Sequence, residues 1–212
     1  MNDVAVISAN MGAFEKVQPY VDQSVPYDFH LLTDENFPPR HNAMTPRLQA
    51  RIPKMFGWQM FPGYRYYIWV DSSCILSHKD SIKWFLEQLG ENDIVFFKHP
   101  HRNTIGEEAE YLKHRLSLPD TYITSRYSNE LLDDQMKEIN DPGLPLYATT
   151  AFIYRPTWDI KQSMKEWWYH TSRYHQIDQL STAYALKQAH IHKIGVINEN
   201  FMKCAYLKPV RV

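Results

Sequence analysis

Short runs of bulky apolar residues alternate along this chain with longer amphipathic segments. The runs are rich in β-branched and aromatic residues, which is typical of strands buried on both faces of a sheet. They predict strands at 4–9, 27–33, 66–70, 93–98, 148–154 and 192–197. The segments between them predict helices at 47–60, 79–89, 104–116 and 128–139, one capped by Thr157, one through Ile177, Leu180 and Tyr184, and a weak one at 14–21. Residues 1–212 are therefore expected to form a single α/β domain, with a central mostly parallel sheet flanked by helices.

Several predicted helices carry boundary signals. Asp80 is placed as an N-cap and Gly90 lies just past the same helix, while Thr104 followed by Glu107 matches a capping box. Pro53 has no N–H to donate, so it predicts a break or kink in the helix at 47–60.

The stretch YRYYIWVDSSCILS at 64–77 is the centre of the functional interpretation. Its buried strand ends at Asp71, and ligands in open α/β sheets bind beyond the carboxyl ends of strands. Asp71 with the hydroxyl of Ser73 is a candidate site for Mn²⁺ or Mg²⁺, since hard divalent ions take oxygen ligands. The alternative is a plain turn, because Asp and Ser also favour turns.

Composition narrows the function classes. The 23 basic and 24 acidic residues give a net charge of −1, which excludes a dedicated nucleic-acid binder. Cys74 and Cys204 are the only cysteines and form neither a disulfide framework nor a zinc site. The first residues do not resemble a signal peptide, and no run approaches the roughly 18 apolar residues of a membrane span. We expect a soluble cytoplasmic protein.

Two basic groups are candidates for binding a diphosphate or a sugar. His99, His101 and Arg102 follow the strand at 93–98 and provide several donors, although a solvated loop has the same composition. Arg51 and Lys54, with Arg47 four residues earlier, fall on one helical face and either reach a pyrophosphate or form a surface ridge.

The acidic candidates lie late in the chain. Asp134 is within the helix predicted at 128–139, and Asp178 is followed by Gln179 at the start of the last helix. An Asp in a first helical turn is also common because of the helix dipole, so Asp178 has a purely structural alternative. Neither a GxGxxG nor a GxxxxGK[ST] loop is present, nor is a GxSxG elbow.

In their order along the chain, these motifs resemble those of the GT-A nucleotide-sugar glycosyltransferases. The nearest group is a glycosyltransferase-like one with plant polysaccharide-related members and domains of chlorella-virus multidomain enzymes, so the chain is compatible with one module of a longer protein. The shared motifs are RxxK at 51–54, YRYYIWVDSS at 64–73, KHPHR…EEAE at 98–110, DDQMKEINDPGLP at 133–145 and RYHQIDQLS at 173–181.

The resemblance implies a Rossmann-like GT-A fold, a UDP-sugar donor and dependence on Mn²⁺ or Mg²⁺. It assigns the nucleotide to Ser8, Asn10, Thr33, Asp34, Arg51, Lys54 and Asp71. It also places Asp71 and Ser73 where the family has its D-x-D metal motif. Ser73 departs from that motif, and His192 is the candidate that would complete the metal shell.

The predicted function is metal-dependent transfer of a sugar from a UDP-sugar to a hydroxyl of a glycan or glycoprotein acceptor. If configuration inverts, a carboxylate must remove the acceptor proton, and Asp178 is the first choice before Asp134. His99, His101, Arg102 and Gln179 are assigned to the sugar. The alternatives are a nucleotide-sugar hydrolase or phosphotransferase with the same metal, and a non-catalytic carbohydrate-binding domain.

Overall fold

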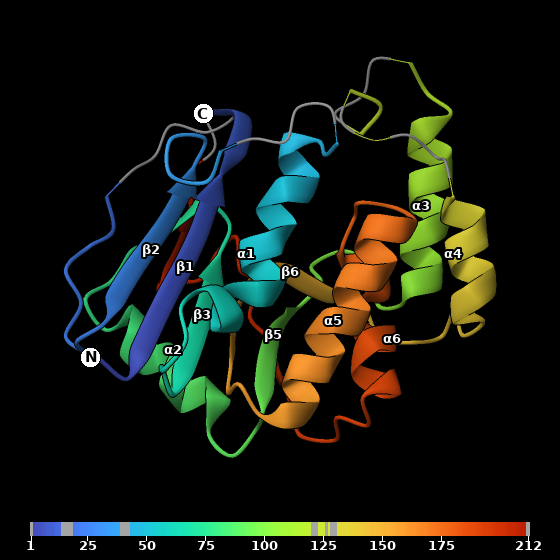
Figure 1. Ribbon diagram of the computed structural model, residues 1–212. Helices are drawn as coiled ribbons and strands as arrows, with labels where there is room; N and C mark the ends of the chain where they lie inside the picture. Colours follow the sequence, from blue (N-terminus) through green and yellow to red (C-terminus); the bar gives the residue numbers. More distant parts are fainter. Residues whose placement is uncertain are drawn as a thin grey trace.

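A six-stranded sheet runs through the molecule, with helices on both of its faces (Figure 1). The computed structural model describes residues 2–13, 19–38, 43–119, 123–125, 127 and 131–210. The strands of the sheet, in spatial order, are β2 (Asp28–Thr33), β1 (Val4–Asn10), β3 (Tyr66–Val70), β6 (Tyr147–Tyr154), β5 (Ile94–Lys98) and β7 (Ile194–Ile197). The predicted α/β fold with a mostly parallel sheet is confirmed.

Strand direction decides which residues meet. β2, β1 and β3 pair in parallel, β6 is antiparallel to both β3 and β5, and β7 is parallel to β5. Within this sheet, therefore, β6 alone runs against the others. The carboxyl ends of the remaining strands share one edge, where Asn10, Asp71 and His99 lie at or just beyond the ends of β1, β3 and β5.

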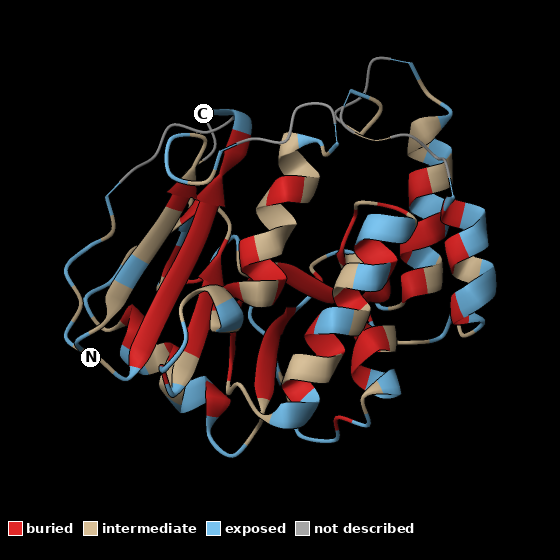
Figure 2. Cartoon of the chain, viewed as in Figure 1, coloured by how far each residue is buried: buried red, intermediate tan, exposed pale blue. Residues whose placement is uncertain are grey.

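Each face of the sheet has its own apolar cluster. α1 (Pro46–Met60), α5 (Trp158–Arg173) and α6 (Gln179–Gln188) cover one face, and α2 (Ser81–Leu89) covers the other together with a small sheet of β4 (Cys74–Leu76) and β8 (Leu207–Pro209). α3 (Ile105–Leu116) packs against α4 (Leu132–Ile139) and α6 at one side. Figure 2 shows the central strands almost wholly buried.

The helix α1 differs from its prediction in how it accommodates proline. Pro53 lies inside a helix that continues on both sides of it, and the non-helical backbone falls three residues later, at Phe56 (φ −116°, ψ 16°). Gly57 follows at the contact with β1, where a Cβ atom would lie 2.3 Å from Ile7 Cδ1. The absence of a side chain at Gly57 lets the irregular last turns of α1 lie directly on the sheet.

The helix caps are partly as predicted. Thr104 and Thr157 accept from the backbone N–H groups of Glu107 and Ile160, at 3.2 and 3.3 Å. Asp80 makes no side-chain cap, because its carboxylate instead accepts a hydrogen bond from Ser24 Oγ.

Some helix boundaries differ from the predicted ones, and two strands were not predicted. The short strands β4 and β8 were not predicted, and α4 is described from Leu132, since residues 128–130 of its predicted start lie outside the described part of the chain. Residues 14–18 of the weak helix predicted at 14–21 lie outside the described part of the chain, and residues 19–21 are not helical.

Candidate active site

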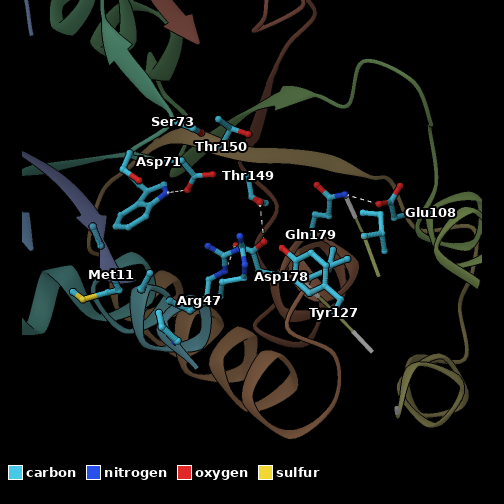
Figure 3. Close-up of a pocket in the computed structure, with 18 of the residues that line it drawn as sticks. Met11, Arg47, Asp71, Ser73, Glu108, Tyr127, Thr149, Thr150, Asp178 and Gln179 are labelled. Atoms are coloured by element: carbon cyan, nitrogen blue, oxygen red, sulfur yellow. Dashed lines mark hydrogen bonds and ion pairs between the residues drawn. The ribbon is translucent and has the colours of Figure 1, made fainter. Parts of the chain in front are cut away.

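A cleft of about 370 Å³ opens at the carboxyl edge of the sheet. It is bordered by the end of β1, the first turns of α1, the loop after β3, the loop after β5, α3 and the start of α6. Figure 3 shows Asp178 between Asp71 on one side and Gln179 with Glu108 on the other. The fold therefore brings the polar residues predicted at the strand ends and the acid predicted at the start of the last helix into one cleft.

Asp71 is fixed by its backbone and by its carboxylate. Its carbonyl accepts from Cys74 N–H at 2.8 Å, so the residue does begin a turn. Its Oδ1 accepts from Trp69 Nε1 at 2.7 Å, and the side chain remains 28% exposed to the cleft. Asp71 therefore begins a turn with its backbone and also presents its carboxylate to the cleft, so the two interpretations of this residue do not exclude each other.

Lys54 is a buried cation beneath the cleft, with 1% of its side chain exposed. Its Nζ lies 2.6 Å from Asp178 Oδ2 and 3.4 Å from Asp71 Oδ1, so it joins the two acids. The rings of Trp69 and Trp167 flank the ammonium, with centroids 5.6 and 6.0 Å away. For Lys54 the surface-ridge alternative is wrong.

Asp178 is held by two cations and a hydroxyl. Besides the contact with Lys54, its Oδ2 lies 3.3 Å from Arg51 Nε, and its Oδ1 accepts from Thr149 Oγ1 at 3.2 Å. The residue stands at the N-cap position of α6 but makes no side-chain cap, so its carboxylate is engaged by α1 and β6 rather than by the backbone of its own helix.

The environment of Asp178 determines its charge. Burial by itself raises the pKa of this carboxyl group, but the charges of Arg51 and Lys54 and the hydrogen bonds from Lys54 and Thr149 outweigh it, and the pKa lies below its ordinary value. Asp178 is therefore a stable anion. A low pKa makes it a weak proton acceptor, which disfavours the role of general base.

The loop after β5 carries a buried, neutral histidine. His99 Nδ1 accepts from Arg102 N–H at 3.1 Å and more weakly from His101 N–H at 3.4 Å, which places the ring proton on Nε2. Burial and the charges of Arg102 and His101 lower the pKa of His99 to about 4. His99 and Arg102 line the cleft, whereas His101 is exposed and is not part of its lining.

The low pKa of His99 predicts a pH dependence of stability. Between pH 6.5, the ordinary pKa of histidine, and about pH 4, the unfolded chain binds a proton at this position that the folded chain does not. The free energy of unfolding should therefore fall as pH decreases through this window. Urea denaturation at pH 7 and pH 5 should show a smaller loss for His99→Gln than for wild type. Equal losses in both proteins would contradict the assignment.

A second ion-paired acid closes the side of the cleft opposite Asp71. Glu108, with 3% of its side chain exposed, binds Arg102 Nε through one oxygen and accepts from Gln179 Nε2 at 2.7 Å through the other. The guanidinium of Arg102 also stacks over Tyr111, 3.9 Å from the ring centroid. This network fixes both Arg102 and Gln179 at the cleft.

With this geometry established, the similarity to known proteins can be assessed. Residues 40–211 match the family described as "TOD1/MUCI70, glycosyltransferase-like domain", which is most of the chain. The chain belongs to this TOD1/MUCI70 family. No curated protein matches it.

Three solved structures illustrate the similarity in fold. The bifunctional glycosyltransferase WbbM is 11% identical with a TM-score of 0.52, over 92% of this chain and 39% of WbbM. A glycosyltransferase involved in glycosylation of the major capsid of PBCV-1 is 11% identical (TM-score 0.47, 92% and 81% covered). The galactosyltransferase LgtC, solved with donor and acceptor sugar analogues, is 8% identical (TM-score 0.41, 92% and 73% covered). The predicted GT-A fold is confirmed, and family membership makes this a glycosyltransferase-like domain.

The nucleotide residues predicted for this TOD1/MUCI70 domain are only partly brought to the cleft. Asn10 and Arg51 line it with Asp71. Thr33 and Asp34 lie at the same sheet edge outside the lining, and Asp34 Oδ2 accepts from Gly12 N–H at 2.9 Å. Ser8, at 2% exposure, borders a separate small cavity with Tyr20.

Two predicted site residues lie elsewhere. His192 is exposed just before β7, whose start pairs with the start of β5, so it lies at the edge of the sheet opposite Asp71. Asp134 is exposed on α4, where it pairs with Lys137 at 3.3 Å, and it is not part of the cleft lining. The structure does not support a shared site for either residue with Asp71.

The residues at Asp71 do not fit the expected divalent ion. Within the described ranges, no group of three His, Cys, Asp or Glu side chains could hold a metal. Asp71 is the one carboxylate of the predicted pair, Ser73 is neutral, and the ammonium of Lys54 already lies 3.4 Å from Asp71 Oδ1. Hard divalent ions favour anionic oxygen ligands, and a neighbouring buried cation repels them.

Some features of the site had no clear sequence signal. Thr149 and Glu108 were not predicted, the latter because two glutamates at the start of α3 are explained by helix capping. In the part of the chain that the structure describes, no helix is both long and apolar enough to cross a bilayer.

Proposed function

We propose that this domain transfers a sugar from a UDP-sugar to a hydroxyl of a glycan acceptor. The observation that carries the proposal is the single cleft in which Asn10, Asp71, His99 and the Asp178–Gln179 pair converge, in a chain of a glycosyltransferase-like family. A volume of about 370 Å³ is within the usual range for a small-ligand site.

The cleft divides by chemistry. Asn10 and Ser73, at the ends of β1 and β3, are assigned to the nucleoside, and Arg47 and Arg51 of α1 to the diphosphate. Two other residues are suited to bind the sugar. The Nε2–H of His99 can donate a hydrogen bond to a sugar hydroxyl, and the anionic carboxylate of Asp178 can accept one from a sugar hydroxyl.

The reaction breaks the bond between the anomeric carbon and the diphosphate oxygen and forms one to the acceptor oxygen, whose proton passes to the departing UDP or to solvent water. Its transition state resembles an oxocarbenium ion, so the leaving diphosphate gains negative charge. Cations fixed beside the cleft stabilise that charge without reorganising. Because Lys54 and Thr149 already bind the carboxylate of Asp178, we assign Asp178 to orienting the sugar rather than to removing the acceptor proton.

A nucleotide panel tests the proposal. UDP should raise the melting temperature more than CDP or GDP, because a ligand that binds only the folded state stabilises it by about 2.7 kcal/mol at 100 times its Kd. Differential scanning fluorimetry measures this directly. Equal shifts with all three nucleotides, or none with any, would contradict a uridine site.

Two assays separate the alternatives. Release of free sugar from a UDP-sugar at the same rate with and without acceptor would favour a hydrolase. Binding of a free glycan with no response to any nucleotide would favour a carbohydrate-binding domain.

A further inference from the structure

We propose that this domain binds the diphosphate of its donor through the guanidinium groups of Arg47 and Arg51, without a divalent metal ion. The inference rests on the proposed function and specifies how that function neutralises the leaving group. It starts from the mismatch between the residues at Asp71 and the needs of a metal.

The first step concerns the charge of Asp71. Lys54 Nζ lies 3.4 Å from its Oδ1, so a cation already balances this carboxylate. The lysine is held in place, since it also contacts Asp178 at 2.6 Å and has 1% of its side chain exposed. A divalent ion on Asp71 would therefore have to bind beside a fixed positive charge that has no route to solvent.

The second step concerns the other possible ligands. Around Asp71, the cleft is lined by the hydroxyls of Ser72, Ser73, Thr149 and Thr150, which are neutral. The two remaining acids of the lining are ion-paired. Glu108 is paired with Arg102, and Asp178 is paired with Arg51 and Lys54. Among the described residues that line the cleft, Asp71 therefore has no second carboxylate beside it that could help to bind a metal ion.

The third step concerns what replaces the metal. Arg47 and Arg51 lie one turn apart on α1 and both line the cleft. Arg51 Nε lies 3.3 Å from Asp178 Oδ2, and the Arg47 guanidinium carbon lies 5.7 Å from the ring centroid of Tyr127. With Lys54 they give three positive charges against the two negative charges of Asp71 and Asp178, so this group of side chains keeps a net positive charge. Guanidinium groups also match phosphate oxygens in a bidentate geometry.

Calorimetric titration of UDP into the full chain tests the inference, once in EDTA and once in MnCl₂. We expect the dissociation constants for UDP to agree within about twofold in the two buffers, because binding uses no metal ion that EDTA would remove. Binding that requires Mn²⁺ would overturn the inference and leave the proposed function standing. Absence of UDP binding in both buffers would contradict the proposed function itself.

Substitutions identify the groups responsible. In EDTA, Arg47→Gln should weaken UDP binding by about tenfold or more, which is the usual effect of losing a charged hydrogen bond, and should leave the affinity for uridine unchanged. Arg65→Gln is the matched control, because Arg65 is exposed and lies outside the cleft. Wild-type affinity of Arg47→Gln for UDP would overturn the assignment, and an equal loss for uridine would show a structural effect instead.

Discussion

Lys54→Met should lower the free energy of unfolding by about 3–5 kcal/mol, the usual effect of breaking a buried ion pair from one side. Methionine fills much of the same volume but leaves Asp178 with Arg51 as its remaining ion-pair partner among the described residues. It also removes the cation next to Asp71. Urea denaturation, with and without the substitution, measures the loss.

A control and a rescue distinguish this effect from a change in packing. Lys165→Met makes the same replacement at an exposed position of α5 and should change stability by less than about 0.5 kcal/mol. The double variant Lys54→Met with Asp178→Asn should recover part of the loss, because it removes both charges. A wild-type denaturation midpoint for Lys54→Met would disprove the buried ion pair.

Asp178→Asn should reduce sugar transfer by about 10²-fold, the order expected when a reacting group is displaced by about 1 Å. Asparagine keeps the shape but loses the charge that holds Arg51 and Lys54. The affinity for the UDP-sugar should fall by more than the affinity for UDP, which lacks the sugar and reports only the altered support of Arg51. Kinetics and calorimetry on the same preparation give both values.

The same variant tests the general-base hypothesis. A base would lose turnover while donor binding stays intact, which would contradict the orienting role proposed for Asp178. Because the pKa of Asp178 is lowered, its charge should be constant at and above pH 5, and its contribution to stability should be lost only at more acidic pH, below its ordinary pKa. Asp134→Asn is the control, since Asp134 is exposed and outside the cleft.

The sheet was predictable because its four central strands are apolar on both faces. Such runs differ from the amphipathic helices between them, and their carboxyl ends locate Asn10, Asp71 and His99 at one edge. The strands β4 and β8 have three residues each, too few for a periodic pattern. The position of His192 was in fact readable, because a residue before a parallel strand lies at the opposite edge from residues that follow one.

The charge arrangement was not predictable. Arg47, Arg51 and Lys54 share a helical spacing that fits a surface ridge as well as a buried cluster, and only packing shows that Lys54 lies beneath the cleft. The partners of Asp178 come from α1 and β6, which are distant in the chain. Spacing within one helix carries no information about such contacts.

The pairing of β8 with β4 also sets the order in which the cleft is assembled. The N–H of Val210 donates to the carbonyl of Ser73 at 2.8 Å, so the last described residue secures the loop that carries Asp71. More than a hundred residues separate the two, and a ribosome adding roughly 5–20 residues per second needs about 7 to 27 seconds to make them. During synthesis the central strands can therefore pair before Val210 is available to hold the loop that carries Asp71.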